Sequence, residues 1–438
     1  MRSLTRRQVL RAMSAAPLMA LPALGGDGGG RRPRVAVIYT SCYHRSHAHV
    51  LLENFLTPYL FNGRMTNPAI EVASVYADQR AGSGVWPDMT PELTRRFNVP
   101  VFPTIEGALT LGRRELAVEA VLSIGEHGTY ATNRLGVREY PRKRFFDEIV
   151  AVMRRSQRFV PIFNDKHLSY RWEWAREMYD VCREHRIPFM AGSSVPLAQR
   201  RPALELPANC VVEEAVSIHG GPFEIYDFHG LEVLQAFIEA RRGGETGVTH
   251  VEFLPREALF RAAEHGRWSL ELARAAMSAE FGDNVPDITQ PIGGHEPWGI
   301  LVTYRDGTKG TMLKLGYSGT RWNFACRLAG ERQPRVTSHY VGPWRNRCLF
   351  MALSNAIQQF FIRRESPYPV ERTLLTTGIV EAAVRSRAAG ERLETPHLDI
   401  GYQPRDYRAL REDGSSWRIL TENAAESIGF ADRPFPRS

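Results

Sequence analysis

The chain has 438 residues, of which 43% are hydrophobic and 24% charged, so it is long enough for two domains with ordinary packed cores. The formal net charge of +8 comes from arginines spread along the whole length, without a basic stripe interleaved with aromatic residues, which argues against a nucleic-acid partner. Five cysteines without a CxxC pair argue against a disulfide framework and a structural zinc site. Beyond the amino terminus there is no apolar run of about 18 residues, so no membrane-spanning helix is predicted.

Residues 1–30, at the amino terminus, are predicted to be an export signal and a linker and not an element of the fold. Thr5–Arg11 matches a twin-arginine export signal, and a modest apolar stretch follows it. Gly25–Gly30 is typical of a flexible joint, with the mature fold beginning near Arg34. We therefore expect the twin-arginine export machinery as a partner and a periplasmic or secreted location. A basic start followed by a flexible segment is the alternative.

Residues 34–200 alternate short apolar runs with helical patterns. The expected elements are strands at 35–38, 71–76, 118–124, 160–163 and 189–191, and helices at 48–59, 145–156 and 170–185. Strands that alternate with helices are typical of a parallel α/β sheet.

The pattern changes after Pro202. The expected elements are strands at 248–254, 298–304, 310–315 and 322–328, and helices at 227–242, 256–277, 347–361 and 370–389. Asp306-Gly307 is the signal of a tight hairpin between two of these strands. Residues 201–400 are therefore predicted to form a second, α+β domain with a mostly antiparallel sheet, and residues 401–438 a carboxy-terminal tail.

Polar side chains gather where strands of the predicted parallel sheet end. Asn164–His167 follows one strand, and Gly125–Gly128 follows another. Ligands of open parallel sheets bind at the carboxyl ends of the strands, so we expect these residues to lie at one site. The strand at 71–76 leads to Asp78, a place that is typical of a carboxylate holding a ribose hydroxyl and equally typical of a turn residue.

The order of these parts resembles the glucose-fructose oxidoreductase, inositol dehydrogenase and MocA family over residues 34–395. Asn164–Leu168 is similar to the family's Glu-Lys-Pro-Leu turn, Asp227–Glu232 to its Gly-x-His-x-x-Asp helix start, and Thr377–Gly390 to its closing helix. The resemblance implies a Rossmann-like amino-terminal domain and an α+β domain beside the active site. It also implies that an exposed face of the second sheet pairs with another copy, giving a homo-oligomer.

The family's chemistry is hydride transfer between a sugar or polyol carbon and a nicotinamide. The resemblance therefore implies an NAD- or NADP-dependent oxidoreductase acting on a sugar, polyol or keto-sugar. In these roles Lys166 contacts the substrate hydroxyl, His229 is the general acid and base, and Glu232 orients or charge-stabilises the histidine. The alternatives are a surface ion pair for Lys166 and a helix cap at Asp227. The residues expected to bind the substrate are His127, Asp165, His167 and Asp227.

The resemblance breaks at the dinucleotide fingerprint, which needs three glycines for the turn, for the pyrophosphate and for helix packing. Those places hold Tyr39, Ser41 and His44, whose side chains occupy the phosphate volume or bind the phosphates in another way. The expected cofactor-binding residues are Tyr39, Ser41, His44, Asp78 and Glu126.

Carboxylates and imidazoles are also the usual ligands of a divalent metal, although no helical HxxxH spacing is present. A redox-silent member of the family is therefore the alternative function. It would be a carbohydrate lyase or hydrolase, with or without a metal that activates water, or a sugar-binding protein.

Overall fold

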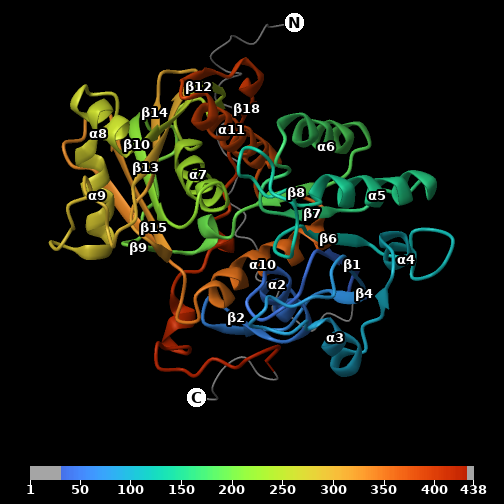
Figure 1. Ribbon diagram of the computed structural model, residues 1–438. Coiled ribbons are helices and arrows are strands. Elements are labelled where there is room, and N and C mark those ends of the chain that lie inside the picture. Colours follow the sequence, from blue (N-terminus) through green and yellow to red (C-terminus); the bar gives the residue numbers. More distant parts are fainter. Residues whose placement is uncertain (1–30, 432–438) are drawn as a thin grey trace, which may run out of the picture. The chain divides into compact units, whose positions relative to one another are not determined.

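The computed structural model describes residues 31–431, and the predicted export signal lies outside them. Its first sheet has six parallel strands in the order β5-β4-β1-β6-β7-β8 (Figure 1). The strands are β1 (Arg34–Tyr39), β4 (Glu71–Ala77), β5 (Val101–Phe102), β6 (Ala120–Ile124), β7 (Ile162–Asp165) and β8 (Phe189–Gly192). Every residue of β6, β7 and β8 is buried, because both faces of a parallel sheet are covered. The predicted Rossmann-like sheet is confirmed.

Helices alternate with these strands. They are α2 (His47–Leu56), α3 (Thr90–Phe97), α4 (Ile105–Thr110), α5 (Arg142–Arg155) and α6 (Trp172–Glu184), and a hairpin of β2 (Tyr59–Phe61) and β3 (Arg64–Thr66) follows α2. Ser46 caps α2, since its side chain accepts the N–H of His49. β1 has β4 on one side and β6 on the other, so the strand order reverses at β1, where open sheets bind ligands.

The second sheet has eight strands in the order β17-β12-β13-β14-β10-β15-β16-β9. The strands are β9 (Gln199–Arg201), β10 (Val212–Gly220), β12 (Val248–Pro255), β13 (Trp298–Tyr304), β14 (Lys309–Lys314), β15 (Ser318–Leu328), β16 (Arg335–Tyr340) and β17 (Leu393–Glu394). β10 and β14 pair in parallel and the other pairs are antiparallel, which confirms the predicted mostly antiparallel sheet. Gly307, at φ 89°, forms the predicted turn between β13 and β14.

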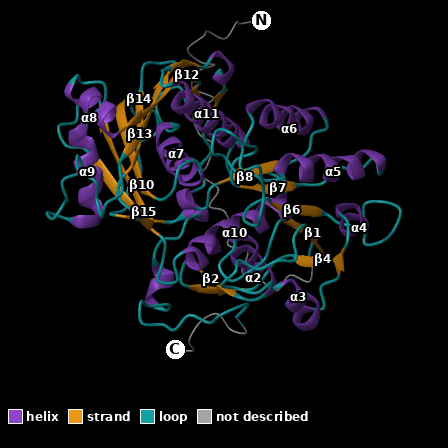
Figure 2. Ribbon diagram, in the orientation of Figure 1, coloured by secondary structure: helices purple, strands orange, loops and turns teal. Residues whose placement is uncertain are grey.

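Helices lie on both faces of the second sheet (Figure 2). α7 (Ile225–Ile238) packs against β10 and β14, while α8 (Arg256–Glu264) and α9 (Leu270–Phe281) pack against the other face. Successive residues of β10 take part in different cores, Ala215 in the core that contains α7 and Val216 in the core under α8 and α9. The face that the resemblance predicts to be open for a second copy is therefore covered by helices of this chain.

The sequence predicts one helix over residues 256–277, and the structure has two. Gly266, at φ 68°, follows the end of α8 in the left-handed region. Ser269 then caps α9, since its hydroxyl accepts the N–H of Leu272 at 3.1 Å. The two helices pack on different strands, α8 on β12 and β13 and α9 on β10, β15 and β16.

The last two long helices connect the parts that carry the two sheets. α10 (Asn346–Arg363) packs on α2, and α11 (Val370–Ala389) packs on α6, α7 and β8. Beyond them, β18 (Gly401–Tyr402) pairs with β11 (Glu245–Thr246). Residues 401–431 are thus packed on the fold, and the domain limits stay predictions, the limit at residue 200 falling inside β9.

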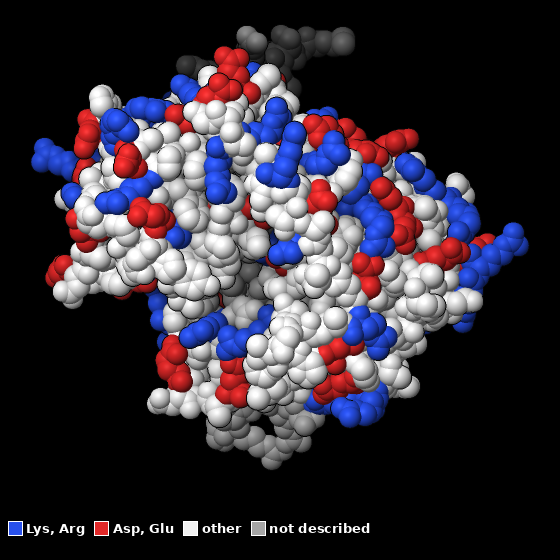
Figure 3. All heavy atoms as spheres, in the orientation of Figure 1, with Lys and Arg blue, Asp and Glu red and all other residues white. Residues whose placement is uncertain are grey.

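The surface carries both signs of charge. Figure 3 shows Lys and Arg groups interspersed with Asp and Glu groups over the face drawn. All five cysteines are free thiols, four of them buried. Within residues 31–431, no helix has the length and apolar character that a bilayer span requires.

Candidate functional site

Lys166 lies just past the carboxyl end of β7, in the left-handed backbone region at φ 65°. Its N–H donates to the carbonyl of Gly192 at 3.2 Å, which ties it to the end of β8. Its ammonium lies 3.2 Å from Oε1 of Glu126, and both side chains are 3% exposed. The ion pair is therefore buried, and the surface alternative for Lys166 is wrong.

Glu126, two residues past β6, lies between two cations. Its Oε1 faces Lys166, and its Oε2 accepts a hydrogen bond of 2.6 Å from Nη2 of Arg142 at the start of α5. Burial alone would raise the pKa of Glu126, but Lys166 and Arg142 outweigh burial and hold it well below its usual range. The carboxylate is ionised at neutral pH and fixes the position of the ammonium.

His229 comes from the first turns of α7, the helix that packs on the second sheet. Its Nδ1 lies 2.6 Å from the hydroxyl of Ser193, which directly follows β8. Burial lowers the pKa of His229 well below its usual value, and the charge of Lys166 lowers it further. The imidazole is neutral at neutral pH. Since a serine hydroxyl can donate or accept, Nδ1 keeps its partner in either tautomer.

Glu232, one turn after His229, is bonded elsewhere than to the histidine. Its Oε1 accepts hydrogen bonds from Thr376 at 2.6 Å and from Thr373 at 3.2 Å, both on α11. Its Oε2 accepts the N–H of Ser193 at 3.4 Å. Burial raises the pKa of Glu232. The predicted role of Glu232, to orient or charge-stabilise His229, stays a prediction, since its oxygens are bonded to α11 and to the turn after β8.

A second polar set lies at the start of α2. Nδ1 of His47 is 2.6 Å from Oδ2 of Asp165, and the His47 N–H donates to Nδ1 of His127 at 3.3 Å. Burial, followed by the charge of His47, lowers the pKa of His127 to about 3. The predicted residues Asp165 and His127 thus lie together. His47 was not predicted, because its only sequence signal is its place after a capping serine.

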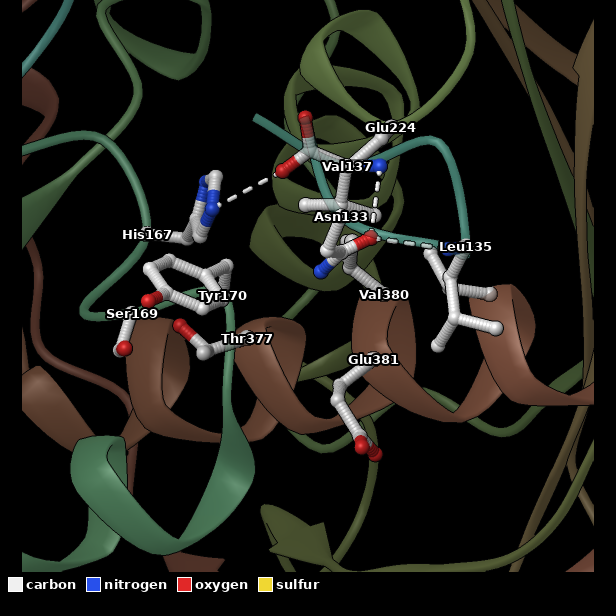
Figure 4. A pocket seen from close by; sticks show the side chains of 11 residues that line it. Asn133, Leu135, Val137, His167, Ser169, Tyr170, Glu224, Thr377, Val380 and Glu381 are labelled. Atoms are coloured by element: carbon white, nitrogen blue, oxygen red, sulfur yellow. Dashed lines mark hydrogen bonds and ion pairs between the residues drawn. The ribbon is translucent and has the colours of Figure 1, made fainter. Parts of the chain in front are cut away.

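His167 lines a small pocket of about 30 Å³ (Figure 4). Its Nε2 lies 3.0 Å from Oε1 of Glu224 and 2.9 Å from Nη1 of Arg142, so the pocket is linked through Arg142 to the Glu126 carboxylate. Burial lowers the pKa of His167, and Arg142 lowers it further. The lining combines carboxylate and hydroxyl groups with apolar side chains such as Val380, and neither Lys166 nor His229 is part of it.

Asp227 closes the start of α7. Its Oδ2 accepts the N–H of Glu224 at 2.7 Å in a reciprocal capping box. Its Oδ1 lies 2.8 Å from Nε2 of His219 and accepts Nε1–H of Trp298 at 3.0 Å. Both carboxylate oxygens of Asp227 are therefore bonded within the protein, and these contacts agree with the helix-cap alternative.

The side chains at the three fingerprint positions all contact other residues of the protein. The Tyr39 hydroxyl donates to Oγ1 of Thr90 at 2.9 Å, and the Ser41 hydroxyl donates to the carbonyl of Ala81 at 2.8 Å. The His44 ring packs 4.6 Å from the ring of Trp86. All three side chains are buried, so none is available to a phosphate in this arrangement.

The crevice between the ends of β4 and β6 is bridged by the chain itself. Asp78 accepts hydrogen bonds from the hydroxyls of Tyr76 at 2.7 Å and Tyr130 at 2.6 Å, and pairs with Arg144 at 2.5 Å. Burial would raise the pKa of Asp78, but these donors lower it. Next to it, the Gln79 amide makes two hydrogen bonds with the backbone of residue 129, of 2.7 and 2.8 Å.

Among known proteins, the likeness is one of structure. No family model and no curated protein matches the chain. GenD2 from gentamicin A biosynthesis, solved in complex with NAD, matches with a TM-score of 0.54 and 14% identity, over 86% of this chain and 99% of GenD2. A myo-inositol dehydrogenase from Corynebacterium glutamicum matches with a TM-score of 0.51 and 12% identity, over 83% of this chain and 98% of its own.

These matches define a class of fold, a Rossmann-like sheet followed by a mostly antiparallel sheet. That is the fold of the glucose-fructose oxidoreductase, inositol dehydrogenase and MocA family, so the predicted resemblance is confirmed at the level of the fold.

A dinucleotide held as the resemblance implies does not fit this crevice as it stands. The carboxylate that would hold the ribose, Asp78, has three donors already, and the first N–H of α2 is given to His127. The hydrogen bonds between Gln79 and residue 129 cross the crevice beside Asp78. Binding a dinucleotide there requires this bridge to open.

The metal alternative finds no matching ligand set. In the part of the chain that the structure describes, no three His, Cys, Asp or Glu side chains are grouped to hold a metal ion. The imidazoles of the cluster have serine, carboxylate or backbone partners instead, as His229 and His47 show.

The buried imidazoles are expected to make the fold acid-sensitive. Burial, with nearby cations, lowers the pKa of His127 and His339 to about 3. As pH falls below about 6.5, the unfolded chain takes up these protons and the folded chain does not, so the unfolding free energy falls. We expect a loss of roughly 2 kcal/mol for each imidazole between about pH 7.5 and about pH 5, measured by urea unfolding. His339→Gln should reduce the loss of unfolding free energy by the contribution of one imidazole, and an unchanged pH dependence in this variant would contradict the assignment.

Proposed function

We propose that this chain is an oxidoreductase that acts on a sugar, polyol or keto-sugar, with Lys166 and His229 handling the proton of the reacting hydroxyl. The observation that carries the proposal is that both residues bond the chain at the end of β8, Lys166 through its N–H to Gly192 and His229 through Nδ1 to Ser193. Lys166 is also among the charges that lower the pKa of His229. Both residues are less than a tenth exposed, so a substrate reaches them only after neighbouring groups shift.

The two side chains have complementary tasks in this proposal. The Lys166 ammonium, fixed by Glu126, lowers the cost of removing a proton from a hydroxyl beside it. The neutral imidazole of His229 accepts and returns that proton, and Ser193 stays bonded to Nδ1 whichever ring nitrogen carries the proton.

The proposed class of reaction is supported by the two solved structures that this chain resembles. GenD2 was solved with NAD, and the Corynebacterium glutamicum protein is named as a myo-inositol dehydrogenase. We therefore propose NAD or NADP as the cofactor, admitted when the bridge over Asp78 opens. Thr5–Arg11 supports export by the twin-arginine machinery and a periplasmic or secreted location.

The closed crevice favours a second candidate, a redox-neutral enzyme. The same ammonium and imidazole would then serve a carbohydrate lyase or hydrolase by acid and base chemistry alone. This candidate requires no opening between β4 and β6, because the bridge at Gln79 and Asp78 is then a permanent part of the fold.

Dinucleotide titration separates the two candidates. If the bridge opposes entry of NAD or NADP, removing it raises the fraction of open molecules, so Gln79→Ala should bind either dinucleotide about tenfold more tightly than the wild type. Gln157→Ala, whose amide bonds the backbone of its own helix end, is the matched control. Calorimetric titration of both dinucleotides measures the affinities. Absence of binding in every protein would remove the oxidoreductase and leave the redox-neutral enzyme, while equal binding in every protein would show that the bridge is no barrier.

A further inference from the structure

A second, larger cavity lies at the far end of α7 from His229. It has a volume of about 290 Å³ and lies between the end of α7, the strand β9 and two loops around residues 205–209 and 403–411. Phe237 and Ala240 of the helix end line it, and Ala240 is eleven residues beyond His229, or about 16 Å along a helix. The cavity is therefore separate from the lysine and histidine cluster.

Two guanidinium groups at this cavity share one carboxylate. Nη1 of Arg200 lies 3.4 Å from Oε2 of Glu205, and Nη2 of Arg411 pairs with the other oxygen. The Arg200 side chain is 7% exposed and that of Glu205 is 46% exposed, so the cation is buried more deeply than its counter-ion. Burial lowers the pKa of Arg200 to about 10. Arg200 is therefore a buried cation that shares one partly solvated carboxylate with Arg411, so its charge is only partly balanced.

Three buried donors around the same cavity lack partners. Among residues 31–431, Nε of Arg200, Nε of Arg411 and the hydroxyl of Tyr407 have no hydrogen-bond partner. Buried donors are paired in the great majority of native structures, so three unpaired donors beside one cavity call for a missing acceptor. All three residues line the cavity, and Arg200 and Arg411 both contact Glu205.

We propose that this cavity binds a small oxyanion, a molecule that carries a carboxylate or a phosphate group. The planar N–H groups of arginine match the paired oxygens of such a group, and the phenol hydroxyl adds a neutral donor. The bound charge would complete the pairing of Arg200 and Arg411, which Glu205 provides only in part. The site is independent of the function proposed for the Lys166 cluster.

Tyr407→Phe is the sharpest variant, because it removes one oxygen that has no partner in the ligand-free protein. Inorganic phosphate and citrate are titrated separately into the wild type by calorimetry, at an ionic strength held constant with chloride. We expect saturable binding of at least one of them. Tyr407→Phe should weaken that binding at least about tenfold, and Arg411→Gln should abolish it. The midpoint of thermal unfolding of ligand-free Tyr407→Phe should equal or exceed that of the wild type, because no hydrogen bond is lost.

Arg176→Gln is the matched control, since its guanidinium pairs with Asp180 on the solvated side of α6, and it should keep the wild-type affinity. Binding of phosphate alone identifies a phosphate-bearing ligand, and binding of citrate alone a carboxylate-bearing one. Two results would overturn the proposal: no saturable binding of either anion to the wild type, or the same affinity in Tyr407→Phe as in the wild type.

Discussion

Lys166→Met is expected to lower the turnover of the best sugar or polyol substrate by at least about a hundredfold. The substitution removes the ammonium that would lower the cost of deprotonating the substrate hydroxyl, and it keeps most of the side-chain length. Glu126 retains Arg142 as a partner at 2.6 Å, so the change leaves no unpaired buried carboxylate. Turnover is measured with a panel of neutral sugars and polyols, after thermal unfolding has shown that the variant is folded.

Lys143→Met is the matched control for this change. Its ammonium is 12% exposed and pairs with Asp147 at 2.7 Å and Glu177 at 3.2 Å, away from the cluster. Turnover of the control should stay within about twofold of the wild type, since surface ion pairs contribute little. Should the folded Lys166→Met protein turn over as fast as the control, Lys166 would have no part in catalysis. A sugar-binding role would then be the better account of the cluster.

The sequence predicts most strands of the first sheet and four strands of the second, β12 to β15, because their signals are local, whereas β10 in the middle of the second sheet was not predicted. Alternation of strands and helices is enough for the first sheet, and Asp306-Gly307 fixes the hairpin of the second. The break between α8 and α9 was missed, because one glycine inside a helical pattern is usually tolerated. At Gly266 the left-handed backbone and the cap at Ser269 decide the outcome, and both depend on how the helices cover the sheet.

The site was predictable only where topology brings strand ends together. Glu126 and Lys166 follow neighbouring parallel strands, so their meeting could be expected from the strand order. Arg142 and His47 could not be predicted, because their partners lie 16 and 118 residues away and no spacing rule links them. Asp78 shows a further limit, since its place after a strand fits a ribose ligand and a closed turn equally.

Arg347→Met is expected to lower the unfolding free energy by roughly 3–5 kcal/mol. Arg347, on α10, is 1% exposed and donates from Nε to Oε2 of Glu53 on α2 at 3.0 Å. A further N–H lies 3.3 Å from Glu426, in the segment that packs on α2 near the carboxy terminus. Removing the guanidinium leaves Glu53, itself 4% exposed, with a hydrogen bond from the N–H of Ala431 and without a cation. Urea unfolding measures the loss.

The size of this effect depends on burial, which two further variants test. Arg335→Met breaks an exposed pair with Glu331 of 2.7 Å and should cost much less, because exposed ion pairs contribute little to stability. The double variant Glu53→Gln with Arg347→Met should recover part of the loss, because no buried charge is then left unpaired. If Arg347→Met costs no more than Arg335→Met, the ion pair contributes nothing to holding residues 426–431 against α2. If instead the double variant is less stable than Arg347→Met alone, the cost arises from lost packing around the Arg347 side chain and not from the unpaired Glu53 carboxylate.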